Sequence, residues 1–96
     1  METPRLFALE GRTALVTGGG RGLGESIAIG LAEAGADVVV ASRKLEACEQ
    51  VTRRIEALGR KAWALSADLS DLDQVDRLAT QTFERVERLD ILVNNA

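Results

Sequence analysis

The feature that most constrains the fold of this chain is a regular alternation between short apolar runs and longer stretches with helical periodicity. Runs of three to five mostly apolar, β-rich residues are typical of strands, and a run without polar alternation is typical of a strand that is covered on both faces. The chain contains such runs at 13–17, 38–41, 62–65 and 91–93. The sequence therefore predicts four strands, of which the run 38–41 is expected to be covered on both faces, and the stretches between the strands are each long enough for a helix.

Each of these stretches carries apolar residues at spacings of three or four, which place them on one face of a helix. Gly35 and Gly59 follow the first two stripes, where glycine can end a helix in the left-handed conformation. Ser70 precedes the third stripe, with Asp71 and Asp73 behind it, and this order predicts a serine N-cap. The three stripes are Leu23, Ile27, Leu31 and Ala34; Leu45, Cys48, Val51, Ile55 and Leu58; and Leu72, Val75, Ala79, Thr82 and Val86.

The order strand–helix–strand, repeated along the chain, predicts the topology of the sheet. Connections of this length between strands are right-handed crossovers, which make the sheet parallel. We therefore expect an α/β fold, a Rossmann-type doubly wound parallel sheet of order 3-2-1-4, with the fourth strand beside the first. A length of 96 residues allows one domain at most.

Composition excludes several classes of function. The formal net charge is −3 and the charges are interspersed, so no basic stripe indicates a nucleic-acid partner. One cysteine and no histidine argue against a disulfide framework, a Cys-based zinc site and the commonest general base. The first ten residues contain no apolar leader segment, and the run 38–41 is too short to cross a bilayer. We expect a cytoplasmic protein without a membrane partner.

The segment Thr17–Gly24 joins the first strand to the first helix. Backbone N–H groups and a helix N-terminus meet at such a turn and form a ready anion site. Gly18 can permit the tight turn, Gly22 removes a Cβ where a diphosphate would approach, and Gly24 lets the helix pack closely on the strand. The spacing is T-G-x-x-x-G-x-G, which is neither G-x-G-x-x-G nor a P-loop. The alternative is a glycine-rich turn that binds no ligand.

The second predicted strand is followed by Ser42, Arg43 and Lys44. In a site for NAD, an acidic residue near this point accepts bonds from the ribose hydroxyls. Ser42 and Arg43 instead offer a hydroxyl and a guanidinium, which suit the 2′-phosphate of NADP, and Arg21 could approach the same phosphate. We therefore expect NADP to be preferred over NAD. Alternatively, Arg43 and Lys44 are a solvated pair in a loop.

Polar residues also follow the third and fourth strands. Asp68 and Leu69 come where an adenine would lie if the glycine turn holds a diphosphate, and Asp68 could accept from the adenine amino group. Asn94, Asn95 and Ala96 follow the fourth strand, where asparagine can bridge strand ends or contact a ribose. The alternatives are that Asp68 only begins the next loop and that the asparagines only form a turn.

Taken together, these segments resemble the short-chain dehydrogenase/reductase family. The resemblance rests on the glycine segment 17–24, on Asp68-Leu69, on Asn94-Asn95-Ala96, and on the opening residues 9–16, and it covers nearly the whole chain. The chain is similar to the 3-oxoacyl-carrier-protein-reductase-like and gluconate-dehydrogenase-like members of this family. The resemblance implies an oxidoreductase that transfers a hydride between NADP(H) and a small carbonyl or alcohol substrate, and that is a homo-oligomer when complete.

The resemblance also implies a role for each candidate residue. The glycine segment would wrap the diphosphate, Arg43, which follows Ser42, the 2′-phosphate, Asp68 and Leu69 the adenine, and Asn95 and Ala96 the ribose and the central sheet. The candidates of the glycine segment are Gly18, Gly20, Arg21, Gly22, Leu23 and Gly24.

The chain departs from the family in one respect. Members catalyse hydride transfer with a Ser, a Tyr and a Lys further along the chain, and this chain contains no tyrosine. We therefore expect residues 1–96 to be the N-terminal, dinucleotide-binding part of a single Rossmann domain whose catalytic part lies outside this chain. Without the strands of that part, the strand at 91–93 is expected to be an exposed edge of the sheet. Two alternatives are a non-catalytic module that senses NADP(H) and, less compatible with Arg43, an S-adenosylmethionine methyltransferase.

Overall fold

The computed structural model describes residues 8–95, and in this range four strands alternate with three helices. Each predicted strand is present, extended by at most two residues. None of the described helices is long and apolar enough to cross a membrane. The elements are β1 (Thr13–Thr17), α1 (Gly22–Glu33), β2 (Asp37–Ser42), α2 (Leu45–Ala57), β3 (Ala62–Ser66), α3 (Leu72–Arg85) and β4 (Ile91–Asn94).

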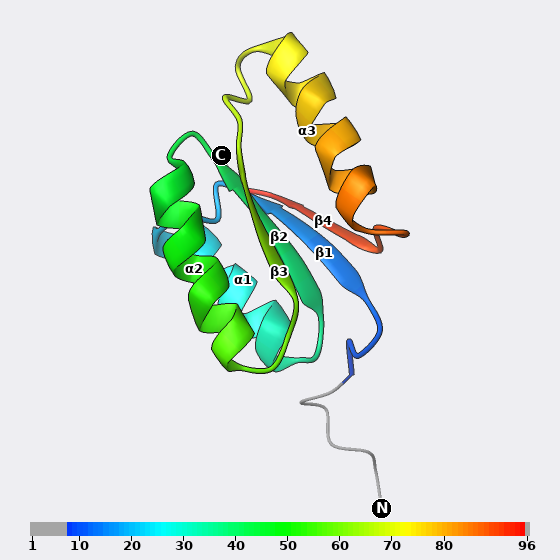
Figure 1. Ribbon diagram of the computed structural model, residues 1–96. Coiled ribbons are helices and arrows are strands. Elements are labelled where there is room, and N and C mark those ends of the chain that lie inside the picture. Colours follow the sequence, from blue (N-terminus) through cyan, green and yellow to red (C-terminus); the bar gives the residue numbers. More distant parts are fainter. Residues whose placement is uncertain (1–7, 96) are drawn as a thin grey trace, which may run out of the picture.

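The strands form one parallel sheet of order β3-β2-β1-β4 (Figure 1). β1 pairs in register with β2 from Thr13 opposite Asp37, and with β4 from Ala14 opposite Ile91. The predicted Rossmann-type sheet and the position of the fourth strand beside the first are therefore confirmed. Because all strands run in one direction, their carboxyl ends meet at a single edge of the sheet.

Helices cover both faces of the sheet, as the apolar strands require. Figure 1 shows α1 and α2 on one side of the sheet and α3 on the other. The valines of β2 alternate between the two sides, so that Val38 and Val40 face α1 and α2 whereas Val39 faces α3. Each face thus has its own buried cluster, and the central strands separate the two.

The face that α1 buries differs from the predicted stripe. Its buried residues are Gly24, Ala28 and Ala32, whereas the side chain of Leu23 is 68% exposed. The small residues form the contact because they allow the helix axis to approach the sheet closely, and the larger Ile27 packs at the margin. Leu45 and Leu58 at the two ends of the second stripe are exposed as well, and so is Leu72 at the start of the third, whereas Val86 at the end of the third stripe is buried.

The predicted start of α3 is also corrected. Its N-cap is Asp71, whose carboxylate accepts from the N–H of Asp73 at 3.0 Å. Ser70 instead donates its N–H and its hydroxyl to the carboxylate of Asp68, at 3.0 and 2.7 Å. An acidic side chain suits the helix N-terminus as well as serine does, so Ser70 is available for the loop before the helix. The expectation for the first helix end is confirmed, since Gly35 has a φ of 110°.

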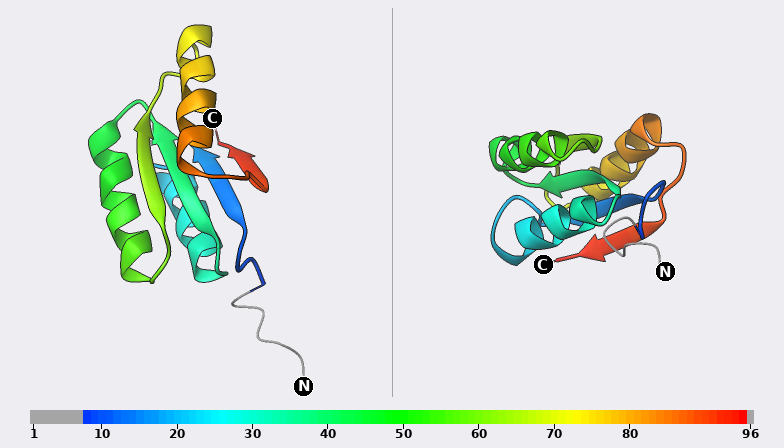
Figure 2. Two further views of the ribbon diagram at one scale, coloured as in Figure 1. Left: turned by 45° about the vertical axis from the view of Figure 1, so that its right-hand side comes forward. Right: turned by 90° about the horizontal axis from the view of Figure 1, so that it is seen from below.

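β4 lies at the edge of the sheet beside β1, as the left view of Figure 2 shows. On this strand Leu92 is 63% exposed. Its register partner Leu15 belongs to the cluster under α3, so Leu92 lies on the face of the sheet that α3 covers elsewhere. The expectation of an exposed apolar edge at 91–93 is therefore confirmed.

Asp90 fastens this edge strand to β1. Its N–H donates to the carbonyl of Thr13 and its carboxylate accepts from the N–H of Thr13, both at 2.9 Å. The same carboxylate lies 2.9 Å from Arg88 Nε and 3.5 Å from Arg12 Nη1. The hydrogen bond from Thr13 is the main cause that lowers the pKa of Asp90 below its ordinary value of 3.8; burial opposes it, and the two arginines lower the pKa further.

We predict that Asp90 makes the stability of the fold acid-sensitive. A carboxyl whose pKa is lowered by folding stabilises fully above 3.8, and this stabilisation is lost as the pH falls through its folded-state pKa. In urea unfolding at a series of pH values, Asp90→Asn should lower the free energy of unfolding at neutral pH and flatten its decline in acid. Asp76→Asn, on the exposed face of α3, is the matched control. Parallel pH curves for Asp90→Asn and the unchanged chain would contradict this role.

Candidate functional site

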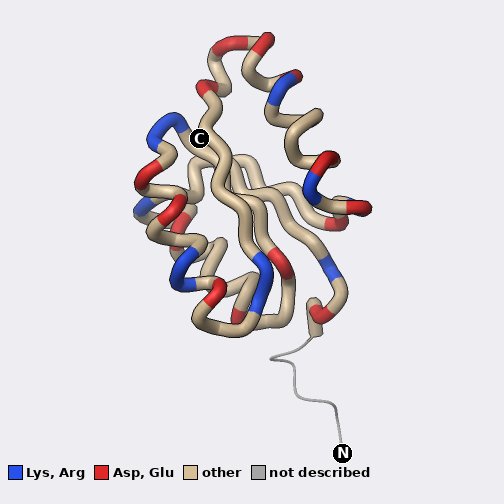
Figure 3. Tube along the Cα trace, in the orientation of Figure 1, with Lys and Arg blue, Asp and Glu red and all other residues tan. Residues whose placement is uncertain are grey.

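A hollow of about 920 Å³ opens at the carboxyl edge of the sheet. Most of the candidate residues from the sequence line it, and they come from the loops that follow all four strands (Figure 1). Figure 3 shows basic positions in the loop between β2 and α2 at the same end of the molecule as acidic positions before α3. The candidates in the lining are Gly18, Gly20, Arg21, Ser42, Arg43, Asp68, Leu69 and Asn95.

The glycine turn is closely packed, and two of its residues must be glycine. Gly18 has a φ of 71°, and a Cβ built on it would lie 2.1 Å from the carbonyl oxygen of Asn95. A Cβ on Gly24 would lie 2.0 Å from the carbonyl oxygen of Gly18. The first turn of α1 therefore rests directly on the backbone at the end of β1, as the sequence predicts for Gly24.

The N-terminus of α1 faces the turn without a side-chain cap. The N-cap residue is Arg21, which forms no side-chain capping hydrogen bond. The first N–H groups of a helix have no partner within the helix, and with the helix dipole they attract an anion. Gly22 adds to this access, because a Cβ on it would meet nothing within 4 Å. The exposed Leu23 can contribute its N–H here, but its side chain lies outside the core.

Hydrogen bonds fix the loop that carries Arg43. The Ser42 hydroxyl lies 3.3 Å from both the N–H and the carbonyl oxygen of Lys44, and 3.0 Å from the sulfur of Cys48. The Ser66 hydroxyl donates to the carbonyl of Arg43 at 3.2 Å. The backbone around Arg43 is thus held from both sides, while its side chain is exposed beside the hollow.

Asp68 is an ionised acceptor in the lining of the same hollow. The two hydrogen bonds from Ser70 are the main causes that lower the pKa of its carboxyl; burial opposes them, and the positive charge of Arg43, the smallest of these effects, lowers the pKa further. Its backbone N–H donates to Gln74 Oε1 at 2.8 Å, which ties the loop to the first turn of α3. Asp68 can therefore accept a further hydrogen bond from a ligand, with Leu69 next to it in the lining.

The asparagines join β4 to the end of β1. The hydroxyl of Thr17 donates to the carbonyl of Val93 at 3.3 Å and to the side-chain oxygen of Asn94 at 3.0 Å. The N–H of Asn95 donates to the carbonyl of Thr17 at 3.2 Å, and its amide nitrogen lies 3.5 Å from the carbonyl oxygen of Gly18. The strand-bridging expected of asparagine at these positions is present. Ala96, the remaining candidate, lies outside the described residues.

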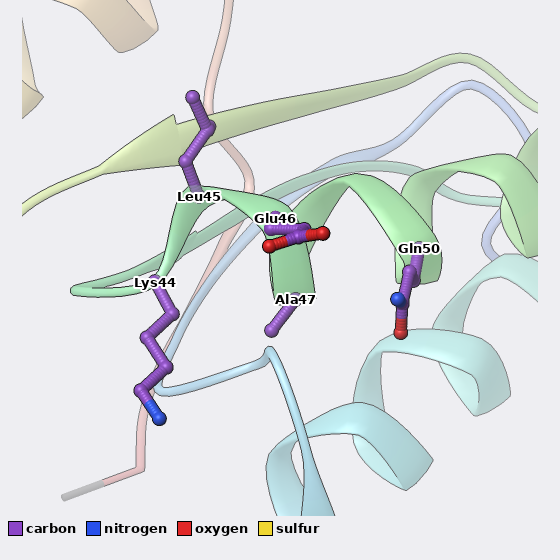
Figure 4. A pocket seen from close by; sticks show the side chains of 5 residues that line it. All are labelled: Lys44, Leu45, Glu46, Ala47 and Gln50. Carbon is purple, nitrogen blue, oxygen red and sulfur yellow. The ribbon is translucent and has the colours of Figure 1, made fainter.

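The candidate list from the sequence omitted two residues at the start of α2. Lys44 and Ala47 line the main hollow, and they also line a smaller hollow of about 420 Å³ beside it. Figure 4 shows that Lys44 and Leu45 point in opposite directions where the helix begins. Lys44 lines the main hollow together with Arg21 and Arg43 and is therefore a third cation beside it. The adjacent basic pair in the sequence was the available signal for Lys44, whereas nothing in the pattern distinguished Ala47.

The contact of Gly24 with the carbonyl oxygen of Gly18 can be tested by two matched glycine-to-alanine substitutions in α1. Gly24→Ala should destabilise the fold by about 1–3 kcal/mol, because its Cβ meets backbone that cannot move independently. Gly30→Ala, where a Cβ meets nothing within 4 Å, should stabilise by up to about 1 kcal/mol through helix propensity. Thermal or urea unfolding of both variants tests the contact. Equal effects of the two substitutions would show that α1 does not rest on Gly18.

Comparison with known proteins gives relatives for nearly the whole chain. A rhamnolipid-biosynthesis 3-oxoacyl-[acyl-carrier-protein] reductase of Pseudomonas aeruginosa is 52% identical over 90 residues, covering 94% of this chain and 35% of that protein. The solved RhlG/NADP active-site complex of Pseudomonas aeruginosa is 49% identical with a TM-score of 0.88, covering 98% of this chain and 38% of that one.

A 7α-hydroxysteroid dehydrogenase solved with NADH and 7-oxo glycochenodeoxycholic acid has a TM-score of 0.92 at 38% identity, covering all of this chain and 38% of that one. The chain thus spans little more than a third of the length of the relatives it matches. The family model for short chain dehydrogenases matches residues 12–96, which include every strand and helix of the described fold. The chain therefore belongs to the short chain dehydrogenase family.

Proposed function

We propose that residues 1–96 are the NADP(H)-binding, N-terminal part of an oxidoreductase domain. The complete protein would transfer a hydride between the nicotinamide and a carbonyl or alcohol carbon of a small substrate. One observation carries this proposal: the uncapped N-terminus of α1 and the cations Arg21, Arg43 and Lys44 border one hollow at the carboxyl edge of the sheet. That combination suits a ligand with a diphosphate and a further phosphate.

The glycine turn fits a diphosphate. Gly22 leaves open space beside the N-terminus of α1, so that phosphate oxygens can approach the backbone N–H groups of Gly22 and Leu23. Gly18, Gly20 and Gly24 keep the turn compact, since each lies against neighbouring atoms that a Cβ would crowd. In this proposal the backbone holds the diphosphate and the glycines shape the cradle.

The basic loop fits a 2′-phosphate. The guanidinium of Arg43 can form a charge-assisted hydrogen bond with a phosphate oxygen, a contact that contributes about 1.5–3 kcal/mol. Since about 1.4 kcal/mol corresponds to a factor of ten in affinity, this contact alone supports a tenfold preference for NADP over NAD. Arg21 and Ser42 border the same space. Related proteins have been solved with NADP and with NADH, so the preference rests on the residues of this chain.

The remaining candidates suit the adenosine and the ribose. The carboxylate of Asp68 can accept from the adenine amino group while Ser70 keeps it ionised and oriented. Asn95 lies at the end of β4 against the glycine turn, where it and Ala96 would contact the ribose. When bound, the nicotinamide supplies or accepts the hydride. In this proposal the contribution of this chain is to fix the cofactor at the sheet edge, and the groups that exchange the proton would come from another part of the complete protein.

The proposed cofactor preference is tested by Arg43→Ala in the complete polypeptide that carries this chain. The substitution removes the guanidinium partner of the 2′-phosphate, so the dissociation constant for NADPH should rise about tenfold or more. The constant for NADH, which has no 2′-phosphate, should change little. Titration of cofactor fluorescence measures both constants.

Arg53→Ala, which removes an exposed arginine from α2 well past the hollow, is the control and should leave both constants unchanged. Ser42→Asp is the reciprocal variant, because a carboxylate at this position repels a phosphate and accepts from ribose hydroxyls; it should shift the preference toward NADH. Equal weakening of NADPH and NADH binding by Arg43→Ala would refute the role in 2′-phosphate binding.

A further inference from the structure

A buried thiol lies directly behind the Ser42 hydroxyl. Cys48, in the first turns of α2, is fully buried in the cluster between the sheet and the helices α1 and α2. Its sulfur is 3.0 Å from Ser42 Oγ. On its other side Ser42 borders the hollow next to Arg21 and Arg43. Ser42 therefore links this thiol to the proposed cofactor site through a hydrogen bond.

The hydrogen bonds of the Ser42 hydroxyl can be counted. A hydroxyl donates one proton and accepts up to two. The N–H of Lys44 donates to Ser42 Oγ at 3.3 Å. Burial raises the pKa of the Cys48 thiol, so the group keeps its proton at neutral pH and can donate it to the same oxygen. Both accepting positions of Ser42 are then filled, and its own proton remains to be donated.

Two acceptors compete for the Ser42 proton. The carbonyl oxygen of Lys44 lies 3.3 Å away, which is long for a hydrogen bond between a hydroxyl and an oxygen. A phosphate oxygen in the hollow is charged, and hydrogen bonds to charged acceptors are about twice as strong as those between neutral groups. A phosphate beside Ser42 would therefore take the proton from the Lys44 carbonyl.

We propose that Cys48 is a positioning residue for cofactor choice: its thiol donates to Ser42 Oγ and so directs the Ser42 hydroxyl proton toward the 2′-phosphate of NADP. This inference rests on the proposed binding of NADP(H) and adds a specificity-determining residue that does not touch the cofactor. Gly20 supports the arrangement, because a Cβ there would lie 3.0 Å from Ser42 Oγ and 3.2 Å from the Cβ of Ala47. The hydroxyl is thus confined between the glycine turn and α2.

The test compares Cys48→Ala, Cys48→Ser, Ser42→Ala and the double variant Ser42→Ala/Cys48→Ala in the complete polypeptide. Dissociation constants for NADPH and NADH are measured by fluorescence titration. Cys48→Ala should weaken NADPH binding about threefold to fivefold, the size expected for one lost hydrogen bond, and leave NADH binding unchanged. Cys48→Ser keeps a donor and should restore the preference for NADPH. The double variant should bind NADPH no more weakly than Ser42→Ala, since Cys48 acts only through Ser42.

Val51→Ala is the matched packing control. Val51 lies in the same buried cluster as Cys48, and its truncation should lower the melting temperature without changing the ratio of the two constants. A second measurement uses only the unchanged protein. With NADPH bound, the infrared S–H stretching band of Cys48 should lie at the lowered frequency that is typical of a thiol donating a hydrogen bond. A band at the free-thiol frequency would overturn the proposal.

The outcomes separate this inference from the proposed function. If the unchanged protein prefers NADPH but Cys48→Ala keeps that preference, or weakens both cofactors equally, the positioning role is wrong and the proposed function stands. If the unchanged protein binds NADPH and NADH equally, the proposed cofactor preference fails and the role of Cys48 fails with it.

Discussion

The close packing of α1 on the end of β1 is the contact on which the rest of this structure depends. Gly24 lies so near the carbonyl of Gly18 that no side chain fits between them, and Ala28 and Ala32 continue the same buried face along the helix. This approach brings the N-terminus of α1 to the carboxyl edge of the sheet. A larger residue at position 24 would move the helix away and open the turn, and the proposed anion site would be lost with it.

The strand ends that surround this turn are joined by polar contacts from three directions. Thr17 and Asn95 connect β1 with β4, Ser66 holds the loop of Arg43 from β3, and Ser70 fixes Asp68 before α3. These short side chains leave the larger charged groups free at the rim of the hollow. The site thus combines a backbone that is held in place with cations and a carboxylate that remain available to a ligand, which is the arrangement favourable for binding a charged cofactor without reorganisation.

The spacing of apolar residues along the chain predicts where the strands lie, and the connections between them predict their order. Both also predict the edge of the sheet at which the candidate residues meet. Apolar runs identify β1 to β4, and the crossovers set the order in which they lie. The buried face of α1 could not be read in the same way, since burial there favours small residues over the larger Leu23. The N-cap of α3 was predicted one residue too early, because an acidic side chain at Asp71 suits the helix N-terminus as well as the hydroxyl of Ser70 does. The contact of Cys48 with Ser42 joins two elements across a turn, and apolar periodicity assigns the cysteine only to the core.

The claim that the N-terminus of α1 holds a cofactor diphosphate is tested most directly by backbone amide NMR of the complete polypeptide during titration with NADPH. If the diphosphate binds there, the largest shifts and the strongest protection from solvent exchange occur at the N–H groups of Gly22 and Leu23, which have no partner within the helix. Amide signals of these residues that stay unchanged at saturating NADPH, while signals elsewhere move, would contradict it.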